Sequence, residues 1–359
     1  MLIMPLSWNC NLDCRYCIID KSKTKVISID KAKKAIDLYT NYYNKEYPND
    51  FISIYFYGGE PFLNKKLIFN LTEYAKQKGK PLEIILTTNL TILDKEIINY
   101  IKKYNINLSI SLDGTKATND ANRKFKNGQG SFDTIIKNLT LLNENGIYPV
   151  VSFVYDPNIK NLLENLKFVL SLGITEISFK PIMGSITSEN FKEVLNDFNT
   201  AADWYIQELK NRRFPKLKQF FSGVKQVYKS KTEKNNQRIC SAGTRDLFIS
   251  PEGKIYPCNE FFFQNQYDFG SVDNYRSDKH YFFRNFIAKF GSERKLCISC
   301  PFNGFCEGSC MSSNLKKNGK IFEVNNDDFY LYSIINLMSL KIYNAIKDDR
   351  EILLSITKF

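Results

Sequence analysis

Hydrophobic residues recur in short runs along the first 185 residues, separated by longer segments in which they recur at helical spacing. The short runs are rich in β-branched and aromatic residues, which is typical of buried strands. The runs that predict strands are LIMPLSW, ISIYFYGG, LEIILTTN, LSISLDG, PVVSFVYD and EISFKP.

The intervening segments predict helices, because their apolar positions fall on one face, as in DKAKKAIDLYTNYY. These segments lie at roughly 29–46, 64–79, 93–104, 131–145 and 159–172. Six strands alternating with five helices predict βα units and a parallel sheet. Because six units are too few for a closed eight-stranded barrel, we expect an α/β fold with a partial (β/α)6 TIM-type barrel. In such sheets the chemistry gathers at the carboxyl ends of the strands.

The second half of the chain changes character. A helical pattern appears near 190–230 and leads into a Lys-rich joint, whereas turns, glycines and cysteines dominate from about 236 to 320. Within that stretch DLFISPEGKIYPC predicts a hairpin, and residues from about 326 to 349 predict a closing amphipathic helix. The expected parts are a core at 1–188, a helical linker at 189–235, a cysteine-rich domain at 236–325 and a C-terminal helix at 326–359.

Composition and charge favour a globular protein without membrane contact. Of the 359 residues, 43% are hydrophobic, yet no apolar run approaches the roughly 18 residues of a spanning helix. The apolar start MLIMPLSW lacks a basic flank and a cleavage site, so it predicts a first strand rather than a secretory signal, and we expect a cytoplasmic protein. The net charge of +12 comes from scattered Lys, which favours general solubility over nucleic-acid binding, and the basic surface favours an acidic partner.

The nine cysteines fall into separate groups along the chain. An odd number would leave one over in a disulfide framework, and close spacing in a reducing compartment indicates metal ligands instead. The sole histidine, His280, is interpreted as a core or solvated side chain. The groups are Cys10, Cys14 and Cys17; Cys240 and Cys258; and Cys297, Cys300, Cys306 and Cys310.

The first group spans only eight residues, CNLDCRYC. Three thiolates can hold three irons of a four-iron cluster and leave the fourth iron open for a small molecule with an amine and a carboxylate. A zinc site would need a fourth ligand from far away in the sequence. The C-x3-C-x2-C spacing after a first strand resembles the radical S-adenosylmethionine (SAM) enzymes. That resemblance implies that the open iron holds the methionine end of SAM, and that one electron from the cluster yields a 5′-deoxyadenosyl radical which abstracts hydrogen from substrate.

Other residues along the expected barrel fit the same resemblance. In YGGEP, at the end of the second strand, the resemblance implies that Gly58 and Gly59 allow close backbone approach to the SAM amino group and that Glu60 supplies an acceptor. Tyr16 resembles the aromatic residue near adenine. Ser111 and Arg123 match positions that contact the ribose and carboxylate of SAM in related enzymes.

One position departs from the family pattern. The usual Thr-Asn-Gly after the third strand is Thr88-Asn89-Leu90 in this chain. The local turn and any part played by Asn89 are therefore left open.

The remaining cysteines resemble the SPASM domain, a C-terminal extension of radical SAM enzymes that act mostly on peptides and proteins. Twelve residues separate Cys240 from Gly253 and four separate Gly253 from Cys258, and C-x2-C-x5-C-x3-C follows. The resemblance implies a small cysteine-rich domain with two auxiliary 4Fe–4S clusters. The implied ligand sets are Cys240, Cys258 and Cys310 for one cluster, and Cys297, Cys300 and Cys306 for the other.

The seventh cysteine of the family pattern is absent after Cys310. Asp327 or Asp328 falls at about the right distance, either as an iron ligand or as a cap of the last helix. If they cap the helix, each auxiliary cluster keeps an open iron that could bind substrate. A cluster near the substrate could accept the electron that must leave when the product is oxidised, and a purely structural role is the alternative.

Two kinds of reaction remain open under this resemblance. We predict a maturase that modifies a ribosomally made peptide, for example by a thioether or carbon–carbon cross-link. The alternative is an anaerobic sulfatase-maturating enzyme, which oxidises serine or cysteine to formylglycine. Those enzymes place an aspartate base where this chain has Asn259, which cannot take a proton at neutral pH, so Glu260 is the one candidate base. A cluster scaffold without radical chemistry would explain the cysteines but not YGGEP, Ser111 or Arg123.

The expected partners follow from the predicted reaction. They are a peptide or protein substrate, which could carry an acidic leader, and an electron donor such as flavodoxin or ferredoxin. Because the cysteine loop starts at residue 10, we expect the leader to bind a separate protein or a groove on the enzyme. The aromatic run Phe261-Phe262-Phe263 could line such a groove or form ordinary hairpin core.

Overall fold

The computed structural model describes residues 1–20, 22, 24–79, 81–233, 240–262, 264–288, 297, 299–306 and 308–357, so Phe263 lies outside the described residues. The chain forms two compact units. The first comprises Met1–Leu112, Asn119–Val150 and Ser241–Ile287, and the second comprises Asp113–Thr118, Val151–Cys240 and Ala288–Phe359.

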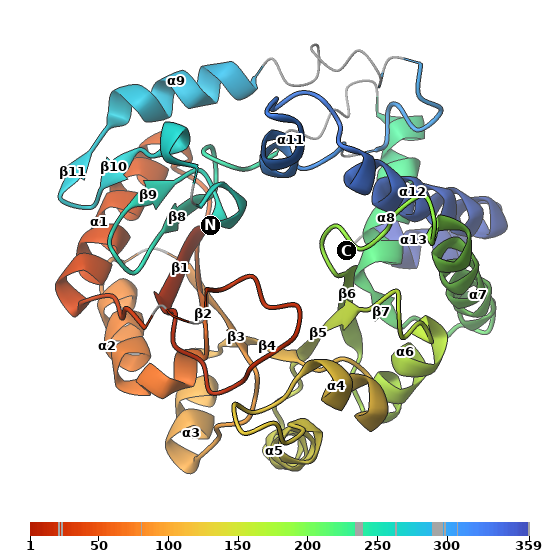
Figure 1. Cartoon of the computed structure of the whole chain (residues 1–359), viewed down its shortest axis with the longest axis horizontal. Helices are drawn as coiled ribbons and strands as arrows, with labels where there is room; N and C mark the ends of the chain where they lie inside the picture. The colour runs from red at the N-terminus through yellow and green to blue at the C-terminus, as the bar shows by residue number, and fades with distance from the viewer. Residues whose placement is uncertain are drawn as a thin grey trace. The chain divides into compact units, whose positions relative to one another are not determined.

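The first unit is built on a sheet in which the strand order is β4-β3-β2-β1-β8-β9 (Figure 1). Its strands pair in parallel, except that β8 and β9 form an antiparallel hairpin. The first four match predicted strands. Their bounds are β1 (Leu2–Ser7), β2 (Ile52–Gly58), β3 (Leu82–Thr88) and β4 (Asn107–Ser111), and the hairpin strands are β8 (Leu247–Ile249) and β9 (Ile255–Tyr256).

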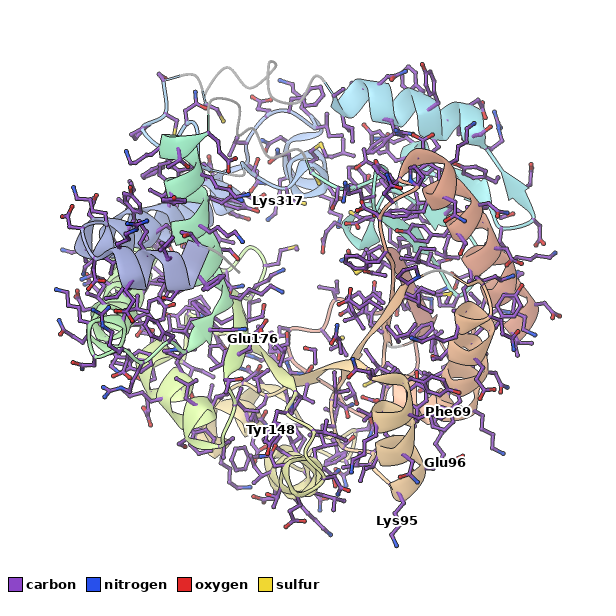
Figure 2. The ribbon with its side chains drawn as sticks, turned by 180° about the vertical axis from the view of Figure 1, so that it is seen from behind. Phe69, Lys95, Glu96, Tyr148, Glu176 and Lys317 are labelled. Carbon is purple, nitrogen blue, oxygen red and sulfur yellow. The ribbon has the colours of Figure 1, made fainter. Side chains whose placement is uncertain are left out.

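Two helices of the first unit begin at residues whose side chains cap them. Ser28 accepts from the backbone N–H of Lys31 at the start of α1, and Asp94 caps α3 in the same way. Phe69 of α2 stacks on Tyr100 of α3 with 4.3 Å between ring centroids (Figure 2). The helices are α1 (Ile29–Glu46), η1 (Pro61–Asn64), α2 (Lys65–Lys76), α3 (Lys95–Tyr104), α5 (Phe132–Glu144) and α9 (Ser277–Ile287); α4 (Lys116–Asn122), which was not predicted, belongs partly to each unit.

The predicted hairpin is confirmed, and it extends the sheet beyond β1. Phe248 of β8 lies opposite Ile3, so a segment from the cysteine-rich part of the sequence pairs with the first strand. Gly253 forms the turn at a φ of +88°, with its N–H bonded to the Ser250 carbonyl at 2.8 Å. After the hairpin come η2 (Asn259–Phe261), η3 (Asn265–Tyr267), β10 (Gly270–Ser271) and β11 (Asn274–Tyr275).

The second unit contains the parallel strands β5, β6 and β7, with helices around them. The Lys-rich joint expected after α7 is itself a helix, α8. Its Gly223 allows close packing on α12, because an added Cβ would lie 1.9 Å from Ser339 Oγ. The elements are β5 (Val150–Tyr155), α6 (Leu162–Ser171), β6 (Glu176–Pro181), α7 (Phe191–Lys210), β7 (Lys216–Leu217), α8 (Lys218–Thr232), α11 (Met311–Asn318), α12 (Asn326–Ile346) and α13 (Arg350–Thr357). Among the described residues, no helix has the length and apolar character needed to cross a bilayer.

His280 is a core side chain of the first unit. Its Nε2–H donates to the Gly243 carbonyl, which fixes the tautomer, and its Nδ1 therefore accepts from the Tyr275 hydroxyl. The ring also stacks on Phe269. Burial lowers the pKa of His280 from 6.5 to about 4, so the ring stays neutral at neutral pH.

This environment predicts a measurable titration. The unfolded chain takes up a proton on His280 at a higher pH than the folded chain does. Acid therefore favours the unfolded state, and the free energy of unfolding should fall by roughly 3 kcal/mol as the pH drops from 6.5 towards 4. In tag-free protein His280 gives the single histidine ring signal in an NMR spectrum, and we expect it to titrate near pH 4. The signal should vanish in His280→Gln, and a midpoint near 6.5 would contradict the buried neutral ring.

Candidate functional site

A pocket in the first unit collects the residues that the sequence placed at the ends of separate strands. It is lined by every predicted N-terminal site residue except Glu60. Strands β2, β3 and β4 contribute lining residues at their carboxyl ends, as expected for a parallel sheet. The predicted residues in the lining are Cys10, Cys14, Tyr16, Cys17, Gly58, Gly59, Ser111 and Arg123.

The cysteine loop is held in place by the segment that follows α4. Leu12 forms an antiparallel bridge with Phe125, and the N–H of Asp13 donates to the Lys124 carbonyl at 2.7 Å. This pairing sets Arg123 beside the loop, with its guanidinium carbon 5.3 Å from the centroid of the Tyr16 ring. The loop and the arginine therefore form one wall, although more than 100 residues separate them in the sequence.

The two glycines of YGGEP are required by the protein's own backbone. A Cβ on Gly59 would lie 2.0 Å from the Asn9 carbonyl oxygen and 2.9 Å from the Cys10 nitrogen. A Cβ on Gly58 would lie 2.4 Å from the Ser7 carbonyl oxygen. The end of β2 thus presses against the end of β1 where the cysteine loop begins, while both glycines still line the pocket.

Glu60 lies behind the pocket lining, at the junction of β2 and β3. Its side chain is fully buried and accepts from the backbone N–H groups of Phe62 and Asn89 and from the Thr88 hydroxyl, at 2.7–3.0 Å. Burial raises the pKa of Glu60 to about 7, although the three donors lower it by stabilising the carboxylate. In the structure this carboxyl ties the end of β2 to the end of β3, and its contact with SAM stays a prediction.

Asn89, whose part the sequence left open, lies beside the first cysteine. Its Nδ2 donates to Asn11 Oδ1 at 2.9 Å and lies 3.7 Å from Cys10 Sγ. Burial raises the pKa of the Cys10 thiol, and the N–H groups of Leu12 and Asn89 oppose this shift by favouring the thiolate. This amide was missed as a site residue, and only the Thr-Asn of the family pattern hinted at it.

Leu90 keeps the turn that the usual glycine would make. Its φ is +56°, a left-handed conformation that costs a non-glycine residue about 1 kcal/mol. Its side chain is fully buried, and Asn138 Nδ2 donates to its carbonyl at 2.9 Å. Burial of a leucine side chain gains about 2 kcal/mol, which offsets the strain. The departure from Thr-Asn-Gly therefore leaves the turn intact.

Tyr57 connects the pocket wall to the segment after the hairpin. It lines the pocket, yet it also lies near Cys258 and Glu260, whose negative charges add to burial in raising the pKa of Tyr57. Trp8, another lining residue, stacks on Phe262 at 5.1 Å and donates from Nε1 to Glu252 at 3.1 Å. Further lining residues that the sequence did not single out are Asn9, Leu12, Ile19, Thr87, Thr88 and Lys126.

Of the aromatic run, Phe261 and Phe262 are described. Phe261 is buried and packs edge-on against Tyr267 and Phe283. Phe262 contacts the hairpin rings Phe248 and Tyr256 as well as Trp8. Both rings therefore belong to the packing around the hairpin, which was one of the two expectations for them.

The C-terminal cysteines are divided between the two units. Cys258 precedes η2 in the first unit, where Asn259 Nδ2 donates to Glu260 Oε1 at 2.9 Å. The others lie in the second unit, and they are Cys240, Cys297, Cys300, Cys306 and Cys310. None of the nine cysteines forms a disulfide. Within the described residues, no three Cys, His, Asp or Glu side chains converge closely enough to hold a single metal ion.

The two aspartates after Cys310 have separate contacts. Asp327 forms an ion pair with Lys317 of α11 at 2.8 Å. Asp328 accepts from the N–H of Cys310 at 3.0 Å and from the Ser313 hydroxyl at 3.1 Å. Asn325, and neither aspartate, caps α12 by accepting from the Asp328 N–H. The expectation that the aspartates cap the last helix is therefore wrong, because Asn325 is the cap. Asp328 instead fixes the backbone at Cys310.

Comparison with known proteins finds a matching domain in the first part of the chain. Residues 4–157 match the model of the Radical SAM superfamily. The radical SAM cyclopropyl synthase TigE of Paramaledivibacter caminithermalis is 25% identical over 92% of this chain and 72% of its own length. The cysteine-type anaerobic sulfatase-maturating enzyme of Clostridium novyi is 24% identical over 86% of this chain and 87% of its own length.

A solved structure matches the whole fold. Native anSMEcpe with bound AdoMet and Kp18Cys peptide superimposes with a TM-score of 0.78, covering 100% of this chain and 98% of that chain at 18% identity. The predicted α/β fold with a partial barrel and a cysteine-rich C-terminal part is confirmed. The chain carries a radical SAM domain at residues 4–157, as the cysteine spacing predicted, and enzymes of the radical SAM superfamily use a 4Fe–4S cluster and SAM.

Proposed function

We propose that this enzyme modifies a peptide by radical chemistry that starts in the pocket at the carboxyl ends of β1–β4. The observation that carries the proposal is the single pocket that brings Cys10, Cys14 and Cys17 together with Gly58 and the other predicted contacts. Relatives named for cyclopropyl synthesis and for sulfatase maturation match nearly the whole length of the chain, which supports action on a peptide or protein.

The pocket residues fit the cofactors of the family. The three cysteines line the pocket, and the Cys10 thiol has N–H donors from Leu12 and Asn89 that stabilise a thiolate. Arg123 offers a planar fork for a carboxylate, and Ser111 a hydroxyl for a ribose. When bound, SAM and the cluster would supply the 5′-deoxyadenosyl radical that takes a hydrogen atom from the substrate.

The residues of the chain would hold and shield these groups. Tyr16 lies against the arginine and so fixes its guanidinium. The Glu60 carboxyl, which receives hydrogen bonds from the end of β3, keeps the glycine pair and the Asn89 turn in register. Trp8, which is only 5% exposed, helps to exclude water from the same pocket.

The C-terminal cysteines would hold two auxiliary clusters, with Cys258 near the pocket through Tyr57. An oxidised product must lose a second electron after hydrogen abstraction, and a cluster near the substrate can accept it. The electron that starts each turnover would come from an external one-electron donor such as flavodoxin or ferredoxin. The basic surface, with a net charge of +12, suits an acidic donor or an acidic leader segment.

Peptide maturation is favoured over formylglycine formation by the segment after the hairpin. Asn259 stands where the sulfatase-maturating enzymes place their base. Its side-chain amide donates a hydrogen bond to Glu260, so one carboxylate oxygen of Glu260 is already engaged. Formylglycine formation remains the second candidate because the solved structure of anSMEcpe matches the whole fold.

Co-expression with a short precursor encoded nearby, followed by mass spectrometry, tests the proposed function. A cross-link is expected to remove two hydrogens from the precursor and to leave no aldehyde. Anaerobic protein should contain about twelve irons, or three clusters of four. A sulfatase peptide that gains an aldehyde, detected with a hydrazide reagent, would favour the second candidate. Failure to modify either substrate while SAM is cleaved would contradict both candidates.

A further inference from the structure

The segment after Arg123 turns back on itself in a tight hairpin. The Phe125 N–H donates to the Gln129 carbonyl at 2.8 Å, and the Gly128 N–H donates to the Phe125 carbonyl at 2.9 Å. Gly128 has a φ of +84°, which closes the turn without strain because glycine has no Cβ. Lys126 is therefore held at the tip of a closed turn.

This hairpin is fixed to the cysteine loop by its backbone. Leu12 forms an antiparallel bridge with Phe125, and the Lys124 carbonyl accepts from the N–H of Asp13 at 2.7 Å. Both contacts involve the residues directly before Lys126 in the chain. Lys126 consequently has a fixed backbone position beside the cysteine loop, and it lines the same pocket as the three N-terminal cysteines.

The described lining of the pocket contains positive charge and no acidic side chain. Arg123 and Lys126 are the cations among the described lining residues, and neither Asp nor Glu occurs among them. Lys126 is exposed, and it makes no ion pair or side-chain hydrogen bond with any residue that the structure describes. A pocket lined in this way favours an anionic ligand.

The two cations differ in depth. Arg123 is only 6% exposed and lies against the Tyr16 ring, and we assign it to the carboxylate of SAM. Lys126 is open to solvent, so it is the cation that a peptide meets as it enters the pocket. The pocket would stay positive with SAM bound, because the cluster with its thiolates carries about −1, SAM about +1 and the two side chains about +2.

We propose that Lys126 binds a carboxylate of the peptide substrate, supplied by an Asp or Glu close to the residue that is modified. The inference rests on the proposed function and narrows the substrate class to peptides that are acidic at this point. The ammonium group would form a charge-assisted hydrogen bond, and the closed turn that carries it keeps the carboxylate near the cysteine loop. Lys126 is thus a specificity-determining residue rather than a catalytic one.

The probe for the test is the precursor peptide that co-expression identifies, made synthetically with a fluorescent label. Fluorescence anisotropy gives its dissociation constant for the reconstituted enzyme with SAM and without reductant, so that no turnover occurs. Lys126→Gln removes the charge and should weaken peptide binding about tenfold, the effect of losing one charge-assisted hydrogen bond. Lys126→Arg should bind within about twofold of the unmodified enzyme, because it keeps a cation that can bind a carboxylate.

Lys124→Gln is the matched control, because Lys124 is an exposed cation of the same hairpin that does not belong to the described pocket lining. Its affinity for the peptide should equal that of the unmodified enzyme. An exchange of charges tests direct contact. Each Asp and Glu of the precursor is replaced by Lys in turn, and one replacement should weaken binding to the unmodified enzyme but restore binding to Lys126→Glu.

Equal peptide affinity of Lys126→Gln and the unmodified enzyme would overturn the inference, as would a set of charge exchanges in which no peptide restores binding to Lys126→Glu. Weaker binding of radiolabelled SAM to Lys126→Gln, with the peptide affinity unchanged, would assign the carboxylate to SAM and would overturn it as well. A precursor that the unmodified enzyme binds but does not modify would instead refute the proposed function, which separates the two failures.

Discussion

Replacing Cys14 with alanine is expected to abolish the release of 5′-deoxyadenosine from SAM by reduced, anaerobic enzyme. Cys14 lines the pocket between the other two cysteines of the loop, and two thiolates cannot hold three irons of a four-iron cluster. The iron content should fall from about twelve to about eight per chain. Chromatography of the quenched reaction and a colorimetric iron assay measure the two quantities.

Cys306→Ala provides the matched control for this experiment. It removes one thiol from the C-terminal set and should likewise cost about four irons. Because Cys306 belongs to the second unit and does not line the pocket, SAM cleavage should persist in this variant while the peptide product is lost. Equal loss of SAM cleavage in both variants would show that the two cysteine groups do not have separate functions.

Replacing Gly59 with alanine should be nearly as damaging, although this residue carries no side chain. The added methyl group would lie 2.0 Å from the Asn9 carbonyl oxygen, and the contact atoms are backbone that cannot turn aside. We expect a loss of about 3 kcal/mol of stability or more. A displacement of the Cys10 backbone by about 1 Å would lower SAM cleavage about a hundredfold.

Gly79→Ala separates this effect from glycine substitution in general. Gly79 has a φ of +73° but no atom within 4 Å of an added Cβ, so only backbone strain of about 1 kcal/mol is expected. Its SAM cleavage should equal that of the unmodified enzyme. Thermal unfolding of the reconstituted proteins gives the stability, and a stable, active Gly59→Ala protein would contradict the tight junction of β1 and β2.

The alternation of strands and helices was predictable because each βα unit has its own periodic pattern. All six predicted strands are present, and α1 spans the residues given by its pattern. The short helices α4 and α11 were missed because polar residues dominate them, and tertiary packing decides their conformation. Pairing of β8 with β1 was also missed, since no local pattern in the hairpin indicates which edge strand it joins.

The site was predictable where spacing within a short segment determines the chemistry. The cysteine loop and the glycine pair are of this kind, and both line the pocket. Contacts between distant segments were not predictable, and Glu60 is the clearest case. Its motif predicted a ligand contact, but nothing in the sequence indicated the hydrogen bonds that link it to the Thr88 hydroxyl and the Asn89 backbone.

The central claim is that the three N-terminal thiols hold an iron centre on which SAM docks. EPR spectroscopy of the reduced enzyme, with and without SAM, tests it most directly, and Cys14→Ala supplies the spectrum of the auxiliary clusters alone. The account predicts that SAM changes the signal of the unmodified enzyme and leaves that of Cys14→Ala as it was. Identical spectra of the unmodified enzyme before and after SAM addition would contradict it.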